Sequence, residues 1–251
     1  MTKGHGRVVV VSGGTRGIGR AITEHFRRLG ETVAICSRSP RDPSLPMDIW
    51  HRQVDVRDRA AMRLFLHDVV ERFGRLDVLV NCAGVSRWRS VEDLDEPLAE
   101  EIIATSLLGT LWGCAASAPL LSRDGCIVNV SSLAGKRGSA NNSAYCAAKF
   151  AVNGITQALA KELGPRGIRV NAVCPVYVET EQLLEALSQR SSPAQEQGVG
   201  QYLKTFAATQ TALGRLPTQE EVAAVVLFLA SGAASAVTGQ CLNVDCGTLP
   251  Q

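Results

Sequence analysis

The sequence predicts an α/β protein in which one doubly wound parallel β-sheet carries helices on both faces. Short apolar runs of strand length alternate with segments of helical periodicity along the whole chain. The first apolar run leads directly into a glycine-rich turn that opens a helix, which is the first half of a mononucleotide-binding unit. Because 251 residues suffice for one large core and no repeat or linker interrupts the pattern, we expect a single domain over residues 1–251.

The expected elements follow one another closely along the chain. Strands are expected at 7–11, 32–36, 53–56, 76–80, 127–130, 168–173 and 241–244. Helices are expected from the glycine turn to Gly30 and over 58–73, 96–121, 145–163 and 218–229, with broken helical pieces over 181–210. Three prolines within residues 39–50 exclude a regular helix there, so this stretch is expected to be a loop.

Composition and charge exclude several classes of protein. The 26 basic and 24 acidic residues leave a net charge of +2 without a long run of one sign, which argues against binding to nucleic acid or a membrane surface. The eight cysteines stand singly and the four histidines lack ligand spacing, so we expect free thiols and no metal site. The apolar run near the N-terminus is too short for a signal peptide or a membrane span, and a cytoplasmic protein is expected.

The glycine turn has the residues that a bound pyrophosphate needs. Gly13 permits the tight turn, Gly17 lets the backbone approach the phosphates, and Gly19 lets the helix pack against the strand. The helix N-terminus then presents free N–H groups and the positive end of its dipole to the anion. The spacing Gly-x-x-x-Gly-x-Gly after a buried strand therefore predicts a dinucleotide-binding site.

The end of the second expected strand indicates which dinucleotide binds. An acidic residue there accepts from the ribose hydroxyls of NAD, whereas an arginine accommodates the 2′-phosphate of NADP. The chain has Ser37 and Arg38 at this point, and Arg16 lies in the glycine turn, so NADPH is predicted in preference to NADH. In the alternative, Arg38 is a solvated loop residue and Asp42 supplies the acid.

Ser132, Tyr145 and Lys149 are candidates for proton-transfer chemistry. Tyr145 and Lys149 are four residues apart and so share one face of a helix. A nearby cation favours the phenolate, so we expect the pKa of Tyr145 to lie below its usual value of about 10. Ser132 ends a buried strand, where its hydroxyl can hold a carbonyl oxygen beside the phenol. In the alternative, Tyr145 and Lys149 are a surface pair on an amphipathic helix.

The chain resembles the short-chain dehydrogenase/reductase family over nearly its whole length. The resemblance rests, in chain order, on residues 12–19, Asp55, residues 81–84, the trio Ser132, Tyr145 and Lys149, and Pro175 with Thr180. The run at 162–171 is similar to that of the oxoacyl-carrier-protein reductases, a ketoreductase group. The resemblance implies a Rossmann fold and the following cofactor-binding residues: Gly13, Thr15, Arg16, Gly17, Ile18, Gly19, Ser37, Arg38, Asp55, Val56, Asn81, Ala83, Gly84, Tyr145, Lys149, Pro175, Val178 and Thr180.

The resemblance also implies catalytic roles. Tyr145 would donate the proton in reduction, Lys149 would lower its pKa and bind the nicotinamide ribose, and Ser132 would orient the substrate oxygen. Ser106 stands where the family has a catalytic asparagine that holds a water linking the lysine to solvent, so Ser106 is predicted to hold that water. Val176 replaces a family glycine beside the nicotinamide. A homodimer or homotetramer and a mobile substrate lid over about 181–213 are also implied.

The expected function is NADPH-dependent reduction of a ketone in a small metabolite to a secondary alcohol. One alternative is NAD(P)-dependent oxidation of a secondary alcohol, because the chemistry is reversible. Another is a nucleotide-binding scaffold subunit, which only Ser106 favours. Arg87, Trp88 and Arg89 follow the fourth strand at the edge where ligands bind, and they either hold an anionic group of the substrate or form a solvated loop.

Overall fold

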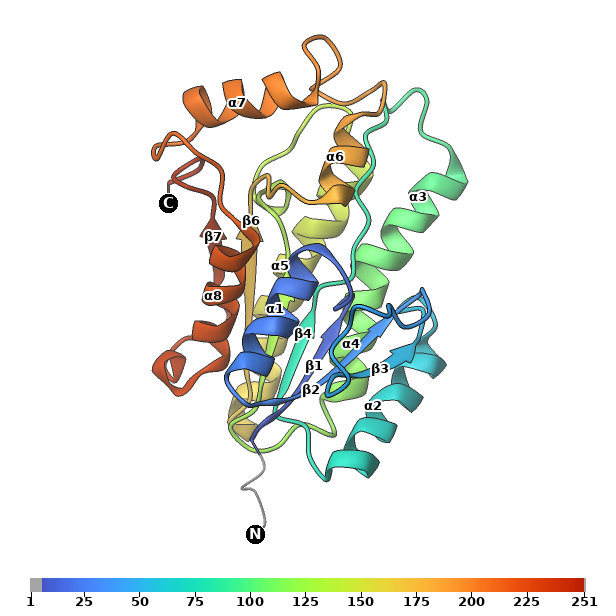
Figure 1. The fold of residues 1–251 in the computed structure, drawn as a ribbon, viewed down its shortest axis with the longest axis vertical. Coiled ribbons are helices and arrows are strands. Elements are labelled where there is room, and N and C mark those ends of the chain that lie inside the picture. Colours follow the sequence, from blue (N-terminus) through green and yellow to red (C-terminus); the bar gives the residue numbers. More distant parts are fainter. Residues whose placement is uncertain (1–5, 251) are drawn as a thin grey trace.

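The computed structural model describes residues 6–250, in which seven parallel strands form one sheet (Figure 1). Their bounds are β1 (Val8–Ser12), β2 (Thr32–Ser37), β3 (Trp50–Gln53), β4 (Val78–Asn81), β5 (Cys126–Val130), β6 (Arg169–Pro175) and β7 (Cys241–Val244). The order across the sheet is β3-β2-β1-β4-β5-β6-β7, and every neighbouring pair is parallel. The predicted doubly wound α/β fold is therefore confirmed.

Helices cover both faces of the sheet (Figure 1). They are α1 (Gly17–Arg28), α2 (Arg59–Phe73), α3 (Glu96–Ile102), α4 (Gly109–Ser117), α5 (Ser143–Leu163), α6 (Glu181–Leu187), α7 (Val199–Gln210) and α8 (Gln219–Ala230). Alternate residues of β1 enter opposite cores, because Val9 and Val11 pack with α1 and α8 whereas Val8 and Val10 pack with α2, α4 and α5. Burial on both faces explains why the strands are continuous apolar runs.

The third strand begins three residues earlier than the sequence pattern indicates. Trp50–Gln53 pair with β2, and Trp50 stacks on Phe65 of α2 with ring centroids 5.7 Å apart. Val54 and Val56 follow the strand and line a pocket instead of extending the sheet. The strand expected at 53–56 is therefore wrong except at Gln53, because an aromatic contact with α2 sets its position rather than the local apolar pattern.

The single helix expected over 96–121 is interrupted. A π-helical turn over Ile103–Leu108 separates α3 from α4, and α4 ends at Ser117. Gly109 directly after this turn packs closely on the neighbouring loop, where a Cβ would come 2.6 Å from Cγ2 of Val56. π-helical turns within helices are frequent at functional sites, and this turn carries Ser106.

The arrangement of the strands leaves a crevice at one edge of the sheet. The chain moves from β1 to β2 and β3 on one side and then returns to β4 on the other side of β1. The loops that follow β1 and β4 therefore diverge at the carboxyl ends of the strands, where open α/β sheets bind ligands. Within residues 6–250, no helix has the length and apolar character needed to cross a membrane.

Candidate active site

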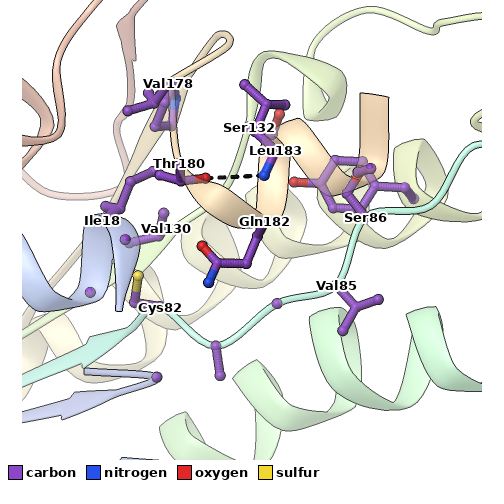
Figure 2. A pocket seen from close by; sticks show the side chains of 18 of the residues that line it. Ile18, Cys82, Val85, Ser86, Val130, Ser132, Val178, Thr180, Gln182 and Leu183 are labelled. Atoms are coloured by element: carbon purple, nitrogen blue, oxygen red, sulfur yellow. Dashed lines mark hydrogen bonds between the residues drawn. The ribbon is translucent and has the colours of Figure 1, made fainter. Parts of the chain in front are cut away.

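A pocket of about 390 Å³ lies at the carboxyl edge of the sheet (Figure 2). Residues from distant parts of the chain meet in it. Most residues that the sequence analysis places at the cofactor or the substrate line this pocket: Gly13, Thr15, Arg16, Gly17, Ile18, Gly19, Ser37, Arg38, Val56, Ala83, Gly84, Ser132, Tyr145, Lys149, Pro175, Val178 and Thr180.

Three predicted site residues do not line the pocket. Asp55 forms an ion pair with Arg57, with 2.6 Å between Oδ2 and Nη2. Asn81 is 2% exposed and donates from Nδ2 to Oδ1 of Asn129 at 2.9 Å, so it links β4 to β5 below the pocket. Ser106 is fully buried in the π-helical turn. Any effect of Asn81 or Ser106 on a ligand therefore passes through the residues that they hold in place.

The glycine turn forms a cradle at one end of the pocket. Gly13 has a φ of 69°, and its N–H donates to the carbonyl of Cys36 at 2.8 Å, which fastens the turn to β2. Gly19 lies so close to this turn that a Cβ would come 2.1 Å from the carbonyl oxygen of Gly13. Helix α1 begins at Gly17, and its first N–H groups have no partner within the helix. The cradle therefore suits an anion such as a diphosphate.

Three buried polar atoms of the pocket lack a hydrogen-bond partner among residues 6–250. They are Thr105 Oγ1, Asn142 Oδ1 and Gln182 Nε2. Buried polar groups in proteins are normally paired, so these atoms indicate where a bound molecule supplies the missing partners. Together with the glycine cradle, they fit a dinucleotide bound beside a substrate.

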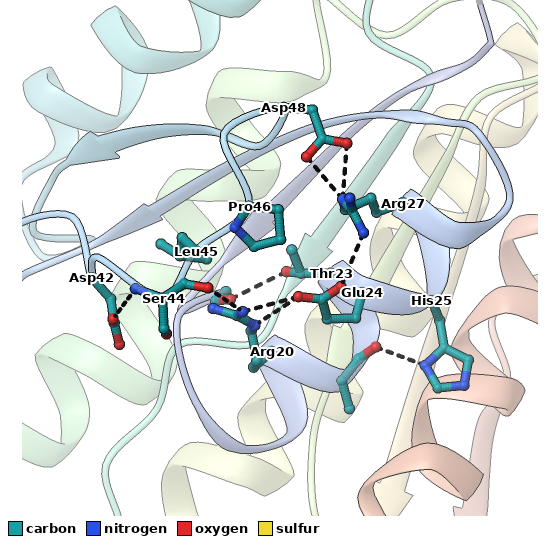
Figure 3. Close-up of polar contacts among 12 residues, drawn as sticks. Arg20, Thr23, Glu24, His25, Arg27, Asp42, Ser44, Leu45, Pro46 and Asp48 are labelled. Carbon is teal, nitrogen blue, oxygen red and sulfur yellow. Dashed lines mark hydrogen bonds and ion pairs between the residues drawn. The ribbon is translucent and has the colours of Figure 1, made fainter.

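Arg38 lines the end of the pocket that follows β2. Its Nη1 lies 3.9 Å from Oε1 of Glu101, and Gln53 Nε2 donates to its carbonyl at 2.8 Å. Asp42, the alternative acid, does not line the pocket. Its carboxylate accepts from the N–H of Ser44 at 2.8 Å (Figure 3), and this bond lowers the pKa of Asp42. The guanidinium of Arg38 is thus the charged group that this end offers to a ligand, with Glu101 as its counter-ion.

Ser132, Tyr145 and Lys149 meet in the pocket. Ser132 follows β5, and its hydroxyl accepts from the N–H of Ala134 at 3.1 Å. Tyr145 lies in the first turn of α5, and Lys149 follows one turn later with Nζ 5.6 Å from the centroid of the phenol ring. Lys149 is 3% exposed and donates to the carbonyl of Val130 at 2.8 Å. This burial excludes a surface Tyr/Lys pair.

Burial decides the pKa values of Tyr145 and Lys149. It raises the pKa of the Tyr145 phenol to about 12, while a side-chain hydrogen bond with Ser132 acts in the opposite direction. It also lowers the pKa of Lys149 to about 8. The expected lowering of the phenol pKa by the lysine is therefore wrong for this structure, because both groups lose hydration. At neutral pH the phenol is protonated and able to donate.

The hydroxyl of Ser106 is bonded twice to one residue. Its oxygen accepts from the N–H of Val85 at 3.0 Å, and its hydrogen is donated to the carbonyl of Val85 at 3.1 Å. A Cβ on Gly84 would lie 3.6 Å from both Ser106 Oγ and Lys149 Nζ. Ser106 thus holds the loop that borders the lysine. The predicted role of Ser106 in holding a relay water stays a prediction.

Replacing Ser106 by alanine is expected to lower the free energy of unfolding by about 1–3 kcal/mol, because both polar groups of Val85 lose a partner. The kcat is expected to fall by on the order of 10²-fold at most, the low end for a proton-transfer contribution. Thermal unfolding and steady-state kinetics measure the two effects. Ser117→Ala is a matched control, since its fully buried hydroxyl donates to Cys114 in α4 away from the pocket. An unchanged kcat for Ser106→Ala would remove Ser106 from the catalytic machinery.

The other end of the pocket is aromatic. Tyr177 packs edge-on against Phe206 of α7 with centroids 4.8 Å apart, and its centroid lies 6.5 Å from that of Trp88. Arg137 and Asn142 also line the pocket. The sequence analysis singled out only Trp88 of these five residues. The others lie in loops or helices whose course over the pocket is set by tertiary packing, so no local pattern identifies them.

Only part of the segment that follows β4 lines the pocket. Arg87 and Trp88 line the pocket and Arg89 does not. Arg87 Nη2 lies 3.6 Å from Glu185 Oε1 of α6, and Trp88 is 4% exposed. The segment is therefore not simply a solvated loop, although the guanidinium of Arg87 already has a carboxylate nearby.

Comparison of the sequence with known proteins shows the family to which the chain belongs. The family model described as Enoyl-(Acyl carrier protein) reductase matches residues 13–248. The monensin polyketide synthase putative ketoacyl reductase of Streptomyces virginiae is 38% identical over 99% of both chains. The 3-oxoacyl-[acyl-carrier-protein] reductase of Thermotoga maritima is 35% identical over 96% of this chain and 97% of its own length.

Comparison with solved structures also gives dehydrogenases and reductases. The ligand-free aldohexose dehydrogenase of Thermoplasma acidophilum superimposes with a TM-score of 0.89 at 31% identity, covering 98% of each chain. A variant of the actinorhodin polyketide ketoreductase with NADPH superimposes with a TM-score of 0.87 at 32% identity, covering 97% of each chain. Both relatives are oxidoreductases by name.

Proposed function

Since the chain belongs to the short-chain dehydrogenase/reductase family and is an NAD(P)-dependent oxidoreductase, we propose that it uses NADPH to reduce the ketone of a small metabolite to a secondary alcohol. The observation that carries this proposal is the half-buried phenol of Tyr145, one helical turn from the buried Lys149, in a pocket that also contains the glycine cradle. A ketone beside this phenol needs one hydride and one proton. The cofactor supplies the hydride when bound.

Each residue of the trio has a task in this proposal. Tyr145 donates its phenol proton to the carbonyl oxygen of the substrate. Ser132, which follows β5 next to the phenol, donates to the same oxygen and stabilises the negative charge that develops on it. Lys149 is fixed by its hydrogen bond to the carbonyl of Val130 and would bind the ribose of the nicotinamide half of the cofactor.

The protonated phenol of Tyr145 is the form that reduction of a ketone uses. Oxidation of an alcohol needs the phenolate as a base, and a pKa of about 12 makes this form scarce at neutral pH. Reduction uses the protonated phenol, which is the form present. The same enzyme can catalyse both directions, so oxidation at high pH remains compatible with the proposed site.

Arg38 and Arg16 support the choice of NADPH. Both line the pocket, and Arg38 lies at the end of β2, where the 2′-phosphate is recognised. A guanidinium can bind a phosphate with two parallel hydrogen bonds. One neighbour, the actinorhodin ketoreductase, was solved with NADPH.

Replacing Arg38 by aspartate is expected to shift the ratio of kcat/KM for NADPH to that for NADH by at least about 10²-fold toward NADH. The change removes a cation from the 2′-phosphate and adds a carboxylate that repels it and accepts from a 2′-hydroxyl. The assay follows NADPH and NADH oxidation with a panel of ketones. Arg28→Asp, an exposed residue of α1 outside the pocket, makes the same change in net charge and should leave the ratio unchanged. An unmoved ratio for Arg38→Asp would mean that Arg38 does not read the phosphate.

We also propose that residues 181–213 form a substrate lid and that the protein is a homodimer or homotetramer. The proposed lid includes α6 and α7, whose side chains Leu183 and Phe206 line the pocket. The proposed interface includes α5, on which Phe150 is 47% exposed. Burial of such a side chain against a second copy is favourable.

A further inference from the structure

Gln182 lies in the first turn of α6, across the pocket from the glycine turn. A Cβ on Gly17 would come 3.0 Å from Gln182 Oε1, so the amide lies directly over the first residue of α1. The other amide atom, Nε2, is buried and has no hydrogen-bond partner in the described part of the chain. Figure 2 shows this amide pointing from α6 into the pocket.

We propose that Gln182 Nε2 donates a hydrogen bond to the diphosphate of the bound cofactor. The inference rests on the proposed NADPH site. In this fold the diphosphate binds at the N-terminus of the helix that follows the glycine turn, which is Gly17 here. A buried N–H without an acceptor is unfavourable, and the phosphate oxygens supply acceptors at the place where the amide lies. Gln182 would therefore cover the diphosphate from the side opposite α1.

The start of α6 fixes the position of Gln182. The hydroxyl of Thr180 caps this helix and accepts from the N–H of Leu183 at 3.1 Å, the contact drawn as a dashed line in Figure 2. Thr180 itself lies against the glycine turn, with its Cγ2 3.3 Å from a Cβ placed on Gly17. The cap thus sets both Thr180 and Gln182 over the cradle.

The amide is suited to this task by its charge as well as its position. It is neutral, so it donates to an anion without releasing or taking a proton. A carboxylate of the same length would only accept hydrogen bonds and would repel the phosphates. Replacing Gln182 by glutamate therefore reverses the interaction while hardly changing the shape of the side chain.

The test is the affinity for ligands measured by titration calorimetry, independently of turnover. For Gln182→Glu, the Kd of NADPH is expected to rise on the order of 30-fold or more, and for Gln182→Met about tenfold, since bonds to charged groups are the stronger ones. Gln189→Glu is the matched control. Gln189 lies just beyond α6 outside the pocket lining, and its Oε1 accepts from the N–H of Trp88 at 3.1 Å, a role that a carboxylate keeps. Its Kd for NADPH should stay within about threefold.

Two smaller probes locate the contact. The 2′-phosphate of ADP-ribose retains the diphosphate and lacks nicotinamide, so Gln182→Glu should weaken it as much as NADPH. Adenosine 2′-monophosphate lacks the diphosphate, so its Kd should not change. If only NADPH is weakened, Gln182 contacts the nicotinamide; if all three are weakened, the substitution distorts the site; and if none is, Gln182 does not touch the cofactor. Each of these three results would overturn the inference about Gln182 and leave the proposed function standing. Wild-type protein that binds none of the three ligands would overturn the proposed function as well.

Discussion

Replacing Tyr145 by phenylalanine is expected to lower the kcat of ketone reduction by on the order of 10³–10⁴-fold, near the upper limit for a general acid. The substitution removes the proton that reaches the carbonyl oxygen and keeps the ring that packs in the pocket. The Kd of NADPH should therefore change by less than about threefold. Steady-state kinetics and titration of the same preparations measure both quantities.

Tyr202→Phe provides the control for this experiment. Its hydroxyl lies 3.1 Å from that of Tyr177, and Tyr202 does not line the pocket. The control therefore removes a phenol hydroxyl from the proposed lid without removing a proton donor, and its kcat should stay within about tenfold of the wild type. If Tyr145→Phe also stayed within tenfold, another group would be the acid.

Replacing Lys149 by methionine is expected to abolish measurable turnover and to raise the melting temperature by several degrees. Lys149 is buried, has a pKa lowered to about 8 by burial, and has no carboxylate partner among residues 6–250. The buried charge of Lys149 therefore lowers the stability of the folded protein, and an apolar side chain of similar length removes this cost. The recovery is partial, because the carbonyl of Val130 loses its hydrogen bond to Lys149. For a domain of this size, each kcal/mol corresponds to about 2–4 °C.

The pH dependence of the stability gain from Lys149→Met distinguishes removal of a buried charge from better packing alone. Below pH 8 both the folded and the unfolded protein carry the proton, so the full cost of the buried charge is present. Between pH 8 and 10.5 the folded protein releases the proton first, and the cost disappears as the pH rises. The gain from Lys149→Met should thus be largest below pH 8 and shrink above it. Lys161→Met, on the exposed side of the same helix, should show no such dependence.

The cofactor half of the site could be predicted from the sequence because its determinants are local. Gly13, Gly17 and Gly19 follow one strand directly, and Tyr145 and Lys149 share one helical turn, so spacing alone brings them together. The substrate half could not be predicted in the same way. Tyr177 and Phe206 meet only because residues 181–213 fold back over the pocket, and this contact leaves no periodic pattern.

The errors in the prediction have a common physical origin. The third strand begins at Trp50 and not at the predicted Gln53, where Trp50 stacks on Phe65, a contact between two elements. The pKa of Tyr145 was expected to fall because only its charged neighbour was considered, whereas burial raises it. Each of these outcomes depends on the tertiary environment of the residue.

The most direct test of the proposed reaction is the transfer of deuterium from NADPH labelled at both hydrogens of nicotinamide C4 to a panel of ketones, followed by mass spectrometry of the alcohols. The wild type should give at least one alcohol that carries one deuterium, and Tyr145→Phe should give on the order of 10³-fold less of it in the same time. Tight binding of NADPH by the wild type without labelled alcohol from any ketone would contradict the proposal. It would indicate a protein that binds the nucleotide without reducing a ketone.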